Sequence, residues 1–501
     1  MIKILNQRIV LLRYLFALLI ILYINNLLAI YNIPSHYTVI YASEVINLAL
    51  ITPTNGNIIT INTPGKYTID KNLIFMPINN NTTGILIDSD NVILELNGYT
   101  ITQNNNTANF TLINIAPGHT NVEISNGTLA NCTGITLKID TGTKITLDSL
   151  AINNSAATGI QLTNCNNSLI TDTYITNCLT NNSSELSGII LNNCTNIKIA
   201  ESASNNHINN AISGLVNGFK FINCSNCTIS NCNSNSHQAD RSNGYLIQTT
   251  DTCIFKNCKA NNNLATQIID TDGVAGFNLI KAVNCHLDSC QARSNSSKNF
   301  AYGFKLLNSQ YNKVNNCTAT HNSTSCSTNN AHAYGFYFNH NDGLICGNNI
   351  VSCQATGNTG GTNINSWGIG FALDGDAKYN KIYDCTADYN NSPIGTGCGI
   401  YINGATCCFI RNNKVIANTG NSPDGGYGIY DTAANSFNLY MQNFAFSNGK
   451  IDGTVINNYS VALAPENEIT RFPSKIAYLN DFECLNFNKA NNYNIEIIEK
   501  P

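Results

Sequence analysis

Gly303-Phe304-Lys305-Leu306 and Gly335-Phe336-Tyr337-Phe338 are two copies of a short motif that recurs throughout this 501-residue chain. Successive copies begin 26 to 35 residues apart. A regular period of this length is typical of solenoids, in which each repeat packs only on its two neighbours. The motif begins at Gly159, Gly188, Gly218, Gly244, Gly276, Gly303, Gly335, Gly370, Gly399 and Gly428.

The sequence of one repeat predicts a coil of three short strands. When the glycine is position 0, positions +1 and +3 are apolar and +2 varies, which is the alternation of a half-buried strand. An apolar residue returns near +11, and a block such as Asn316-Cys317-Thr318-Ala319 follows. The residue before the cysteine breaks the alternation, and Asn suits such a bend because it tolerates the left-handed region. The sequence therefore predicts an all-β parallel β-helix of about twelve coils, and these blocks are too short and β-branched for a helical solenoid.

The ends of the chain differ from the middle. Residues 1–29 place Lys3, Arg8 and Arg13 before an apolar run, as in a signal peptide or a signal anchor. Either segment predicts a secreted or cell-envelope protein, in the periplasm or on the outer surface, with membrane contact only if the segment stays uncleaved. We expect a strand-rich N-terminal cap over 30–83, the β-helix over 84–449, and a C-terminal cap and tail over 450–501.

The charge pattern limits the kinds of partner that the protein is expected to bind. Only 11% of the residues are charged, the formal net charge is −4, and no basic run follows the first 15 residues. Nucleic-acid binding depends on a basic surface that neutralises phosphates. A nucleic-acid partner is therefore not expected.

Several segments resemble a known group of proteins. They are Pro64-Gly65-Lys66-Tyr67, the strand-like run from Gly84, the stretch 91–101 and the stretch 121–129. Together with the repeats they resemble the right-handed parallel β-helix proteins of the pectin-lyase-like superfamily, over about residues 60 to 450. The resemblance implies a right-handed helix. It does not choose an activity, because the superfamily includes polysaccharide lyases, glycoside hydrolases, sugar epimerases, adhesins and an accessory protein for copper-enzyme maturation.

Position +2 of each repeat supplies the ligand candidates. Its side chain should face outward, so we expect Lys220, Tyr337, Tyr401 and Tyr430 to contact a ligand, together with Arg293 from the loop of an intervening coil. Aromatic residues also precede a glycine at Tyr302, Tyr334, Trp367 and Tyr427. These could form a platform for sugar rings, but alternation places position −1 on the inner side with +1, so we expect them to stack in the interior.

One acid–base pair can be assembled from the sequence. Lys305 and Asp272 should lie one or two coils apart, which makes them candidates for catalysis. Asp270 and Asp272 could also hold Ca²⁺, the only cofactor that the sequence suggests, although Asp-Gly pairs are ordinary turn residues. Asp374-Gly375-Asp376 is a second acidic pair. In the resembled lyases an acidic Ca²⁺ cluster works with a basic residue, whereas most motifs of the polygalacturonase-type hydrolases are absent here.

Cysteine is abundant, with 20 residues. The pairs Cys227/Cys232, Cys253/Cys258 and Cys285/Cys290 repeat at one spacing in consecutive coils. Buried thiols stacked in columns explain this spacing, because cysteine is small and often fully buried. Disulfides and a metal site are the alternatives.

Three functional hypotheses follow. The first is an exported, non-catalytic β-helix that presents a long polar face to polysaccharide, a surface glycan or another surface partner. The second is a carbohydrate-active enzyme, in particular a Ca²⁺-assisted polysaccharide lyase. The third is a metal-handling accessory protein that acts through its cysteines.

Overall fold

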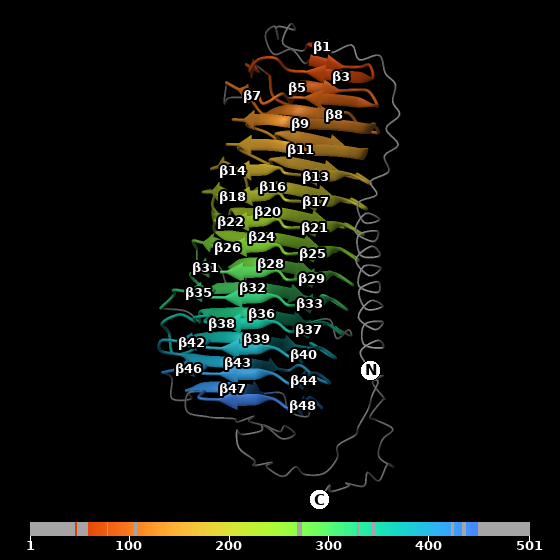
Figure 1. Ribbon diagram of the computed structural model, residues 1–501. Helices are drawn as coiled ribbons and strands as arrows, with labels where there is room; N and C mark the ends of the chain where they lie inside the picture. The colour runs from red at the N-terminus through yellow and green to blue at the C-terminus, as the bar shows by residue number, and fades with distance from the viewer. Residues whose placement is uncertain are drawn as a thin grey trace, which may run out of the picture. The chain divides into compact units, whose positions relative to one another are not determined.

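The computed structural model describes residues 46–47, 59–77, 79–104, 108–267, 273–327, 330–341, 346–421, 425–432 and 437–448. The predicted leader (1–29) and C-terminal tail (450–501) lie outside the described residues. The described chain winds into a right-handed parallel β-helix whose strands stack from β1 to β49 (Figure 1). Each strand pairs in parallel with its counterpart one coil away, for example β32 with β36. The predicted fold is confirmed.

One sheet contains a strand from every coil. Its 14 strands are β2 (Ile59–Ile61), β5 (Thr82–Ile87), β8 (Phe110–Ile115), β10 (Leu137–Asp140), β12 (Ile160–Thr163), β16 (Glu185–Asn192), β20 (Leu215–Ile222), β24 (Arg241–Gln248), β28 (Val274–Ile280), β32 (Phe300–Leu307), β36 (His332–His340), β39 (Trp367–Gly375), β43 (Thr396–Asn403) and β47 (Gly426–Asp431). This stack is slightly longer than the predicted twelve coils. Strand β2, from the segment expected to be a cap, pairs in parallel with β5 and belongs to the same stack.

The second sheet has 27 strands and covers the next two sides of each coil. Its strands are β1 (Ile46–Asn47), β3 (Gly65–Thr68), β4 (Leu73–Phe75), β6 (Val92–Glu95), β7 (Thr100–Gln103), β9 (Thr120–Ala130), β11 (Thr143–Asn153), β13 (Leu169–Thr171), β14 (Tyr174–Thr176), β17 (Lys198–Ala200), β18 (Ala203–Asn205), β21 (Thr228–Ser230), β22 (Asn233–Asn235), β25 (Ile254–Lys256), β26 (Lys259–Asn261), β29 (His286–Asp288), β30 (Gln291–Arg293), β33 (Lys313–Asn315), β34 (Thr318–Thr320), β37 (Asn349–Val351), β38 (Gln354–Thr356), β40 (Lys381–Tyr383), β41 (Thr386–Asp388), β44 (Phe409–Arg411), β45 (Lys414–Ile416), β48 (Leu439–Met441) and β49 (Phe444–Phe446).

Many coils also contain a fourth strand of only two residues. Six of these strands form one sheet: β15 (Leu179–Thr180), β19 (Ile208–Asn209), β23 (Gln238–Ala239), β27 (Leu264–Ala265), β31 (Ser296–Ser297) and β35 (Ser323–Thr324). A further pair consists of β42 (Asn391–Ser392) and β46 (Thr419–Gly420). Two residues are too few to show an alternating pattern, so the sequence predicted three strands per coil and not four.

The bends before the cysteines follow the prediction. Asn231, Asn257 and Asn316 have φ angles of 54°, 52° and 51°, in the left-handed region. Asparagine adopts this conformation at little cost. The Asn257 amide also donates to the Asn231 side-chain oxygen across one coil step, at 3.1 Å. Local backbone preference therefore sets this corner of the coil.

The interior contains a continuous stack of aromatic rings from position +1. Phe219, Tyr245, Phe277, Phe304, Phe336 and Phe371 lie in successive coils, with ring centroids 4.6–4.9 Å apart and planes within 7° of parallel. This spacing matches the distance of about 4.8 Å between paired strands. All six residues are fully buried. The rings therefore fix the vertical registration of six coils.

A ladder of buried asparagines runs beside this stack and was not predicted. It comprises Asn263, Asn295, Asn322, Asn358, Asn390, Asn418 and Asn448. Each side-chain amide donates to the carbonyl oxygen of the next asparagine, at 2.8–3.0 Å. The same oxygen also accepts a backbone N–H, as Asn322 Oδ1 does from Asn295 at 3.2 Å. Buried amides stabilise the core only because these bonds satisfy them.

The cysteines line the interior, as predicted. Nineteen cysteines of the described chain are present as thiols, and all except Cys407 are buried. One column places Cys232, Cys258, Cys290, Cys317, Cys353 and Cys385 in six successive coils. Burial raises the pKa of Cys178 to about 12, because a thiolate would lose its hydration. Such thiols act as small apolar fillers of the core.

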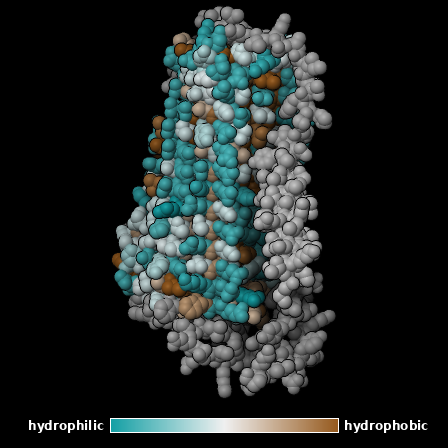
Figure 2. All heavy atoms as spheres, viewed as in Figure 1, coloured by the Kyte–Doolittle hydropathy of each residue, from teal (hydrophilic) through white to brown (hydrophobic). Residues whose placement is uncertain are grey.

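The surface of the coils is polar. Figure 2 shows long rows of hydrophilic residues on one face, with isolated hydrophobic residues between them. The exposed apolar side chains include Ile254 and Leu264, which are 42% and 38% exposed. Scattered apolar residues of this kind are normal on soluble surfaces. No helix long and apolar enough to cross a membrane occurs in the described part of the chain.

Candidate functional site

The outer face of the 14-stranded sheet brings most of the predicted ligand residues together. Strand pairing aligns position +2 of successive coils in one column. In order along the helix axis, the column contains Lys220, Leu246, Asn278, Lys305, Tyr337, Ala372, Tyr401 and Tyr430. The even spacing of the coils makes residues that are remote in sequence direct neighbours.

The aromatic residues before the glycine lie on this same outer face, so their predicted interior position is wrong. The reason is a local break in alternation at the glycine. Tyr302 pairs with Tyr334 and Phe304 pairs with Phe336, but the glycines between them form no such pair. A Cβ built on Gly303 would lie 2.7 Å from the Ala319 Cβ in the interior. Positions 0 and +1 therefore both face inward, and positions −1 and +2 both face outward.

Eight rings form what we call the outer aromatic cluster: Phe300, Tyr302, Tyr334, Tyr337, Trp367, Tyr401, Tyr427 and Tyr430. The cluster is separate from the interior core. Tyr302 and Tyr334 stack at 5.2 Å, as predicted. Trp367 does not continue this pair, because Ile369 occupies the matching position of its coil. Trp367 packs instead on Tyr401 and Tyr430, with centroids 5.1 and 5.9 Å away.

The orientation of these rings decides what they can offer a ligand. Rings stacked in parallel cover one another's faces and expose mainly their edges. Tyr337 is tilted by 44° and 50° from Tyr302 and Tyr334, and Tyr401 by 45° from Trp367. Tyr337, Trp367, Tyr401 and Tyr430 also remain partly exposed. The tilted rings of Tyr337 and Tyr401 can therefore present part of their faces to a bound molecule, whereas Trp367 and Tyr430, which stack within 15° of parallel, offer mainly their edges.

Asp374 adds a carboxylate to the outer aromatic cluster. It lies near the end of β39, where Tyr337 donates its hydroxyl to Oδ2 at 3.0 Å and Asn403 donates its amide to Oδ1 at 2.8 Å. Burial, reinforced by the charge of Asp374, raises the pKa of Tyr401 to about 12. The sequence noted the acidic pair that contains Asp374, but could not place it beside Tyr337, 37 residues away.

His332 packs beside the outer aromatic cluster, against Tyr334, and is a neutral group. Burial lowers the pKa of His332 to about 4, although the negative charge of Asp374 acts in the opposite direction. The ring nitrogen Nδ1 of His332 accepts the backbone N–H of Trp367 at 3.1 Å. At neutral pH the histidine therefore positions Trp367 and adds no positive charge near Asp374.

A shallow hollow lies on the same face, towards the N-terminal end of the helix. It has a volume of ≈ 100 Å³, and the polar groups Arg241, Asn243, Asn278 and Lys305 line it together with Tyr302. Lys305 is only 4% exposed, and its ammonium lies 4.6 Å from the centre of the Tyr302 ring. This is a cation–π contact. Arg241 and Asn278 were not among the predicted ligand residues: Asn278 occupies position +2 of its repeat but is neither charged nor aromatic, and Arg241 precedes its repeat glycine by three residues, outside the motif.

Lys220 lies further along the same column but has a partner. Its ammonium is 2.6 Å from Oε1 of Glu185 and 2.7 Å from Oε2, and Asn217 also donates to Oε1 at 2.7 Å. Lys220 and Glu185 therefore neutralise each other. This leaves Lys220 less available to a ligand than its outward position suggested.

The other predicted site residues lie elsewhere. Arg293 is exposed at the end of β30, in the 27-stranded sheet, so it does not share a face with Lys305. Asp270 and Asp272, predicted for catalysis and Ca²⁺, lie outside the described residues. Among the residues that the structure describes, no group of three or more His, Cys, Asp or Glu side chains could hold a metal ion.

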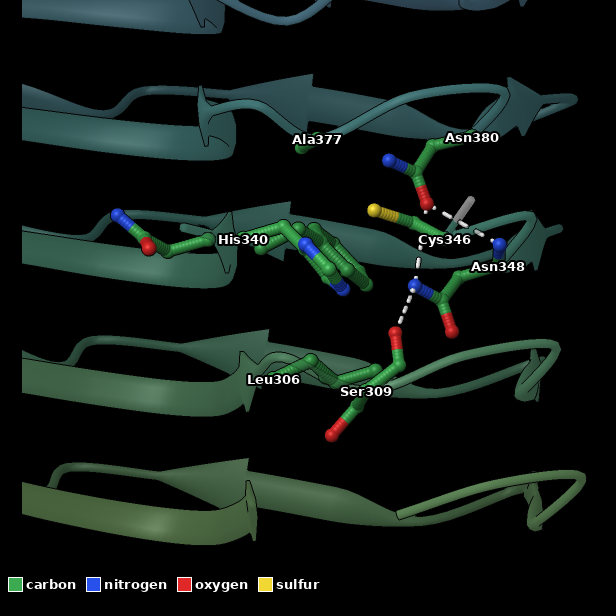
Figure 3. Close-up of a pocket in the computed structure, with 9 residues that line it drawn as sticks. Leu306, Ser309, His340, Cys346, Asn348, Ala377 and Asn380 are labelled. Atoms are coloured by element: carbon green, nitrogen blue, oxygen red, sulfur yellow. Dashed lines mark hydrogen bonds between the residues drawn. The ribbon is translucent and has the colours of Figure 1, made fainter. Parts of the chain in front are cut away.

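A second hollow lies inside the helix, at the level of β36. Figure 3 shows Ser309, Asn348 and Asn380 in successive coils, with the Asn348 amide bonded to the Ser309 carbonyl oxygen and to Asn380 Oδ1, at 2.8 and 3.1 Å. His340 and Cys346 line the same space. The space is too small for a water molecule. It is a packing feature of the core and not a ligand site.

Known proteins resemble the chain in fold. No family model and no curated protein matches the sequence. Among solved structures, the periplasmic alginate epimerase AlgG is 10% identical, with a TM-score of 0.37, over 80% of this chain and 81% of that one. A pectate lyase is 11% identical, with a TM-score of 0.30, over 54% and 68%. A tailspike of an Acinetobacter phage is 12% identical, with a TM-score of 0.35, over 86% and 68%. Similarity at this level reflects the shared β-helix and carries no argument about activity.

Proposed function

We propose that this protein is an exported β-helix that binds glycans along the outer face of its 14-stranded sheet, without catalysis. The proposal rests chiefly on the outer aromatic cluster, in which Tyr337, Trp367, Tyr401 and Tyr430 stay partly exposed on a rigid sheet. Tyrosine and tryptophan combine an apolar face with a polar edge, and they dominate the energetics of many binding surfaces. Sugar rings need the same combination, because they carry both C–H faces and hydroxyl groups.

The rigidity of the face supports the proposal. Strand pairing and the interior ring stack hold the coils in register, so the outer rings lose little conformational freedom on binding. Asp374 and Asn403 lie beside the rings and supply fixed hydrogen-bonding groups. The apolar surface and its polar edge therefore match the usual make-up of a small-molecule or oligosaccharide site.

The start of the chain supports export. Three basic residues and an apolar run form the pattern of a secretion signal. An exported β-helix with a polar surface suits contact with an extracellular polysaccharide or another surface partner.

Trp367 provides the test, because the chain contains a single tryptophan. A glycan array with the full-length protein identifies candidate sugars, and Trp367 fluorescence then measures their affinity. Tyr401→Ala and Tyr430→Ala should each weaken binding about tenfold or more, as expected for aromatic contact residues. Tyr174→Ala is the matched control, because Tyr174 is 50% exposed but lies in the 27-stranded sheet. Binding that survives both cluster substitutions would refute the proposed surface.

A Ca²⁺-assisted polysaccharide lyase is the second candidate. The observation in its favour is the hollow that Lys305 lines beside Tyr302. In such an enzyme Lys305 would act as the general base that removes a proton next to a uronate carboxyl group. Incubation with a panel of polysaccharides, with and without Ca²⁺, would reveal unsaturated products by their absorbance. Products that disappear in Lys305→Ala would establish the lyase, and silence with every substrate would exclude it.

A further inference from the structure

Asp374 differs from the other carboxylates on the outer face of the 14-stranded sheet. Glu185, on that face, pairs with Lys220. By contrast, no Lys, Arg or His side chain of the described residues forms an ion pair with Asp374. Its neighbours are neutral: the Tyr337 hydroxyl and the Asn403 amide donate to it, and His332 is uncharged at neutral pH. Within the part of the chain that the structure describes, the negative charge of Asp374 is therefore not balanced by an ion pair.

The surroundings of Asp374 are aromatic. Tyr337 bonds to the carboxylate, and burial together with the charge of Asp374 raises the pKa values of Tyr334, Tyr337 and Tyr401. These raised values keep the phenols protonated, so they add no competing negative charge. Aromatic ring faces carry partial negative charge and attract cations, with tryptophan the strongest of the three ring types. An unbalanced carboxylate beside several rings is the arrangement that recognises an organic ammonium group.

We propose that Asp374 and the adjacent rings of Tyr337 and Tyr401 form a subsite for the ammonium group of an amine-bearing saccharide. This inference rests on the proposed glycan-binding function and names the class of sugar. The carboxylate attracts the ammonium, and the partly exposed rings contact the C–H groups beside it. A cationic amine could also belong to a ligand other than a sugar, so the experiment includes both kinds.

The experiment uses the full-length protein and Trp367 fluorescence. Four ligands are titrated: glucosamine, the uncharged N-acetylglucosamine, glucose and tetramethylammonium. Glucosamine should bind about tenfold more tightly than either uncharged sugar, as expected for one partly desolvated cation–π and carboxylate contact. Increasing salt should reduce this preference, because it screens charge interactions at a partly exposed site.

Asp374→Asn removes the charge and keeps the size of the side chain. It should abolish the preference for glucosamine, so that glucosamine and N-acetylglucosamine bind with similar affinity. Asp384→Asn is the matched control, because Asp384 is an exposed carboxylate on the far side of the coil that accepts a bond from Asn412. That control should keep the preference, and circular dichroism of both variants should remain that of the folded protein.

The outcomes separate this inference from the proposed function. Equal affinities for charged and uncharged sugars, or a preference that persists in Asp374→Asn, would overturn the ammonium subsite and leave glycan binding intact. Binding of tetramethylammonium that needs Asp374, with no binding of any sugar, would support a cation subsite and refute the glycan function. Absence of every signal would overturn both.

Discussion

Acid is expected to destabilise the β-helix first at the two coils that contain His207 and His237. These rings are fully buried and stack on each other, with centroids 4.8 Å apart. They occupy the column that the buried asparagine ladder continues, since the backbone N–H of His237 donates to Asn263 Oδ1 at 3.1 Å. Two ionisable rings therefore replace two amides inside the core.

The hydrogen bonds require both rings to be neutral. Nδ1 of His207 accepts the backbone N–H of Cys178 at 3.2 Å, and Nδ1 of His237 accepts that of His207 at 3.3 Å. Each Nε2 must therefore carry the proton, and it donates to Ser204 or Ser234 at 2.8 and 3.0 Å. A second proton would place two donors face to face in a fully buried site. Accordingly, burial lowers the pKa of His207 to about 3 and that of His237 well below the usual 6.5.

The direction and size of the effect follow from these pKa values. The unfolded chain binds protons near pH 6.5 and the folded chain does not, so stability is full above this pH and falls as the pH drops towards 3. Each pH unit in this range costs about 1.4 kcal/mol per histidine. At pH 4.5 the two histidines together lower the free energy of unfolding by about 5 kcal/mol, which is comparable to the total stability of many domains. His119, partly buried between Asp88 and Asp90, has a raised pKa and acts in the opposite direction.

The chain itself provides the control variant. Ser204–His207 and Ser234–His237 occupy the positions that Ala260–Asn263 and Ala292–Asn295 fill in later coils, as the contacts of the repeat glycines show. The fourfold variant Ser204→Ala, His207→Asn, Ser234→Ala and His237→Asn extends the ladder with amides that do not titrate. The free energy of unfolding of the wild type and of the variant is measured by urea denaturation at pH 7.5, 6.0 and 4.5.

Between pH 7.5 and 4.5, the free energy of unfolding of the wild type should fall by about 5 kcal/mol more than that of the variant. Equal pH dependence of the two proteins would show that the histidines do not remain neutral in the folded core. A variant that is much less stable than the wild type at pH 7.5 would also contradict the reasoning, because the replacement pairs already occur in neighbouring coils.

Three further predictions concern the core. Phe304→Ala should lower the free energy of unfolding by about 3–5 kcal/mol in urea, because it opens a cavity in the interior ring stack; a loss below about 1 kcal/mol would mean that the stack does not support the fold. Asn322→Ala should lower the free energy of unfolding by about 1–3 kcal/mol for each buried group left without a partner, since Asn295 loses its acceptor. An unchanged urea midpoint would mean that the buried asparagine ladder does not stabilise the core. A thiol reagent should react slowly with the 18 buried cysteines of the native protein and rapidly with all 20 cysteines in denaturant; rapid native reaction of more thiols than Cys407 and Cys484 would contradict the buried columns.

Much of the coil could be predicted from single repeats. The alternation around Phe304, Lys305 and Leu306 correctly assigned inner and outer positions, and Asn316 correctly marked a bend. The cysteine spacing likewise predicted buried columns. These features depend on a few neighbouring residues, so local periodicity is enough to reveal them.

The buried asparagine ladder was harder to predict from the sequence. Its residues follow the third strand, where loops of variable length hide the repeat. Asn322 lies 19 positions after its glycine, whereas Asn358 lies 23 positions after its own. Only the coordinates show that the two amides meet at 2.9 Å.

The sequence by itself determined the stacked β-helix. Its apolar residues recur at every second position along a strand and about every thirty residues along the chain, and both periods can be recognised without the structure. Only the tertiary structure decided which face carries the candidate site. The backbone break at the repeat glycines turns Tyr302 and Tyr334 outward, against simple alternation. The pairing of β36 with β39 then places Asp374 beside Tyr337. Both depend on how whole coils pack on one another, which no single repeat encodes.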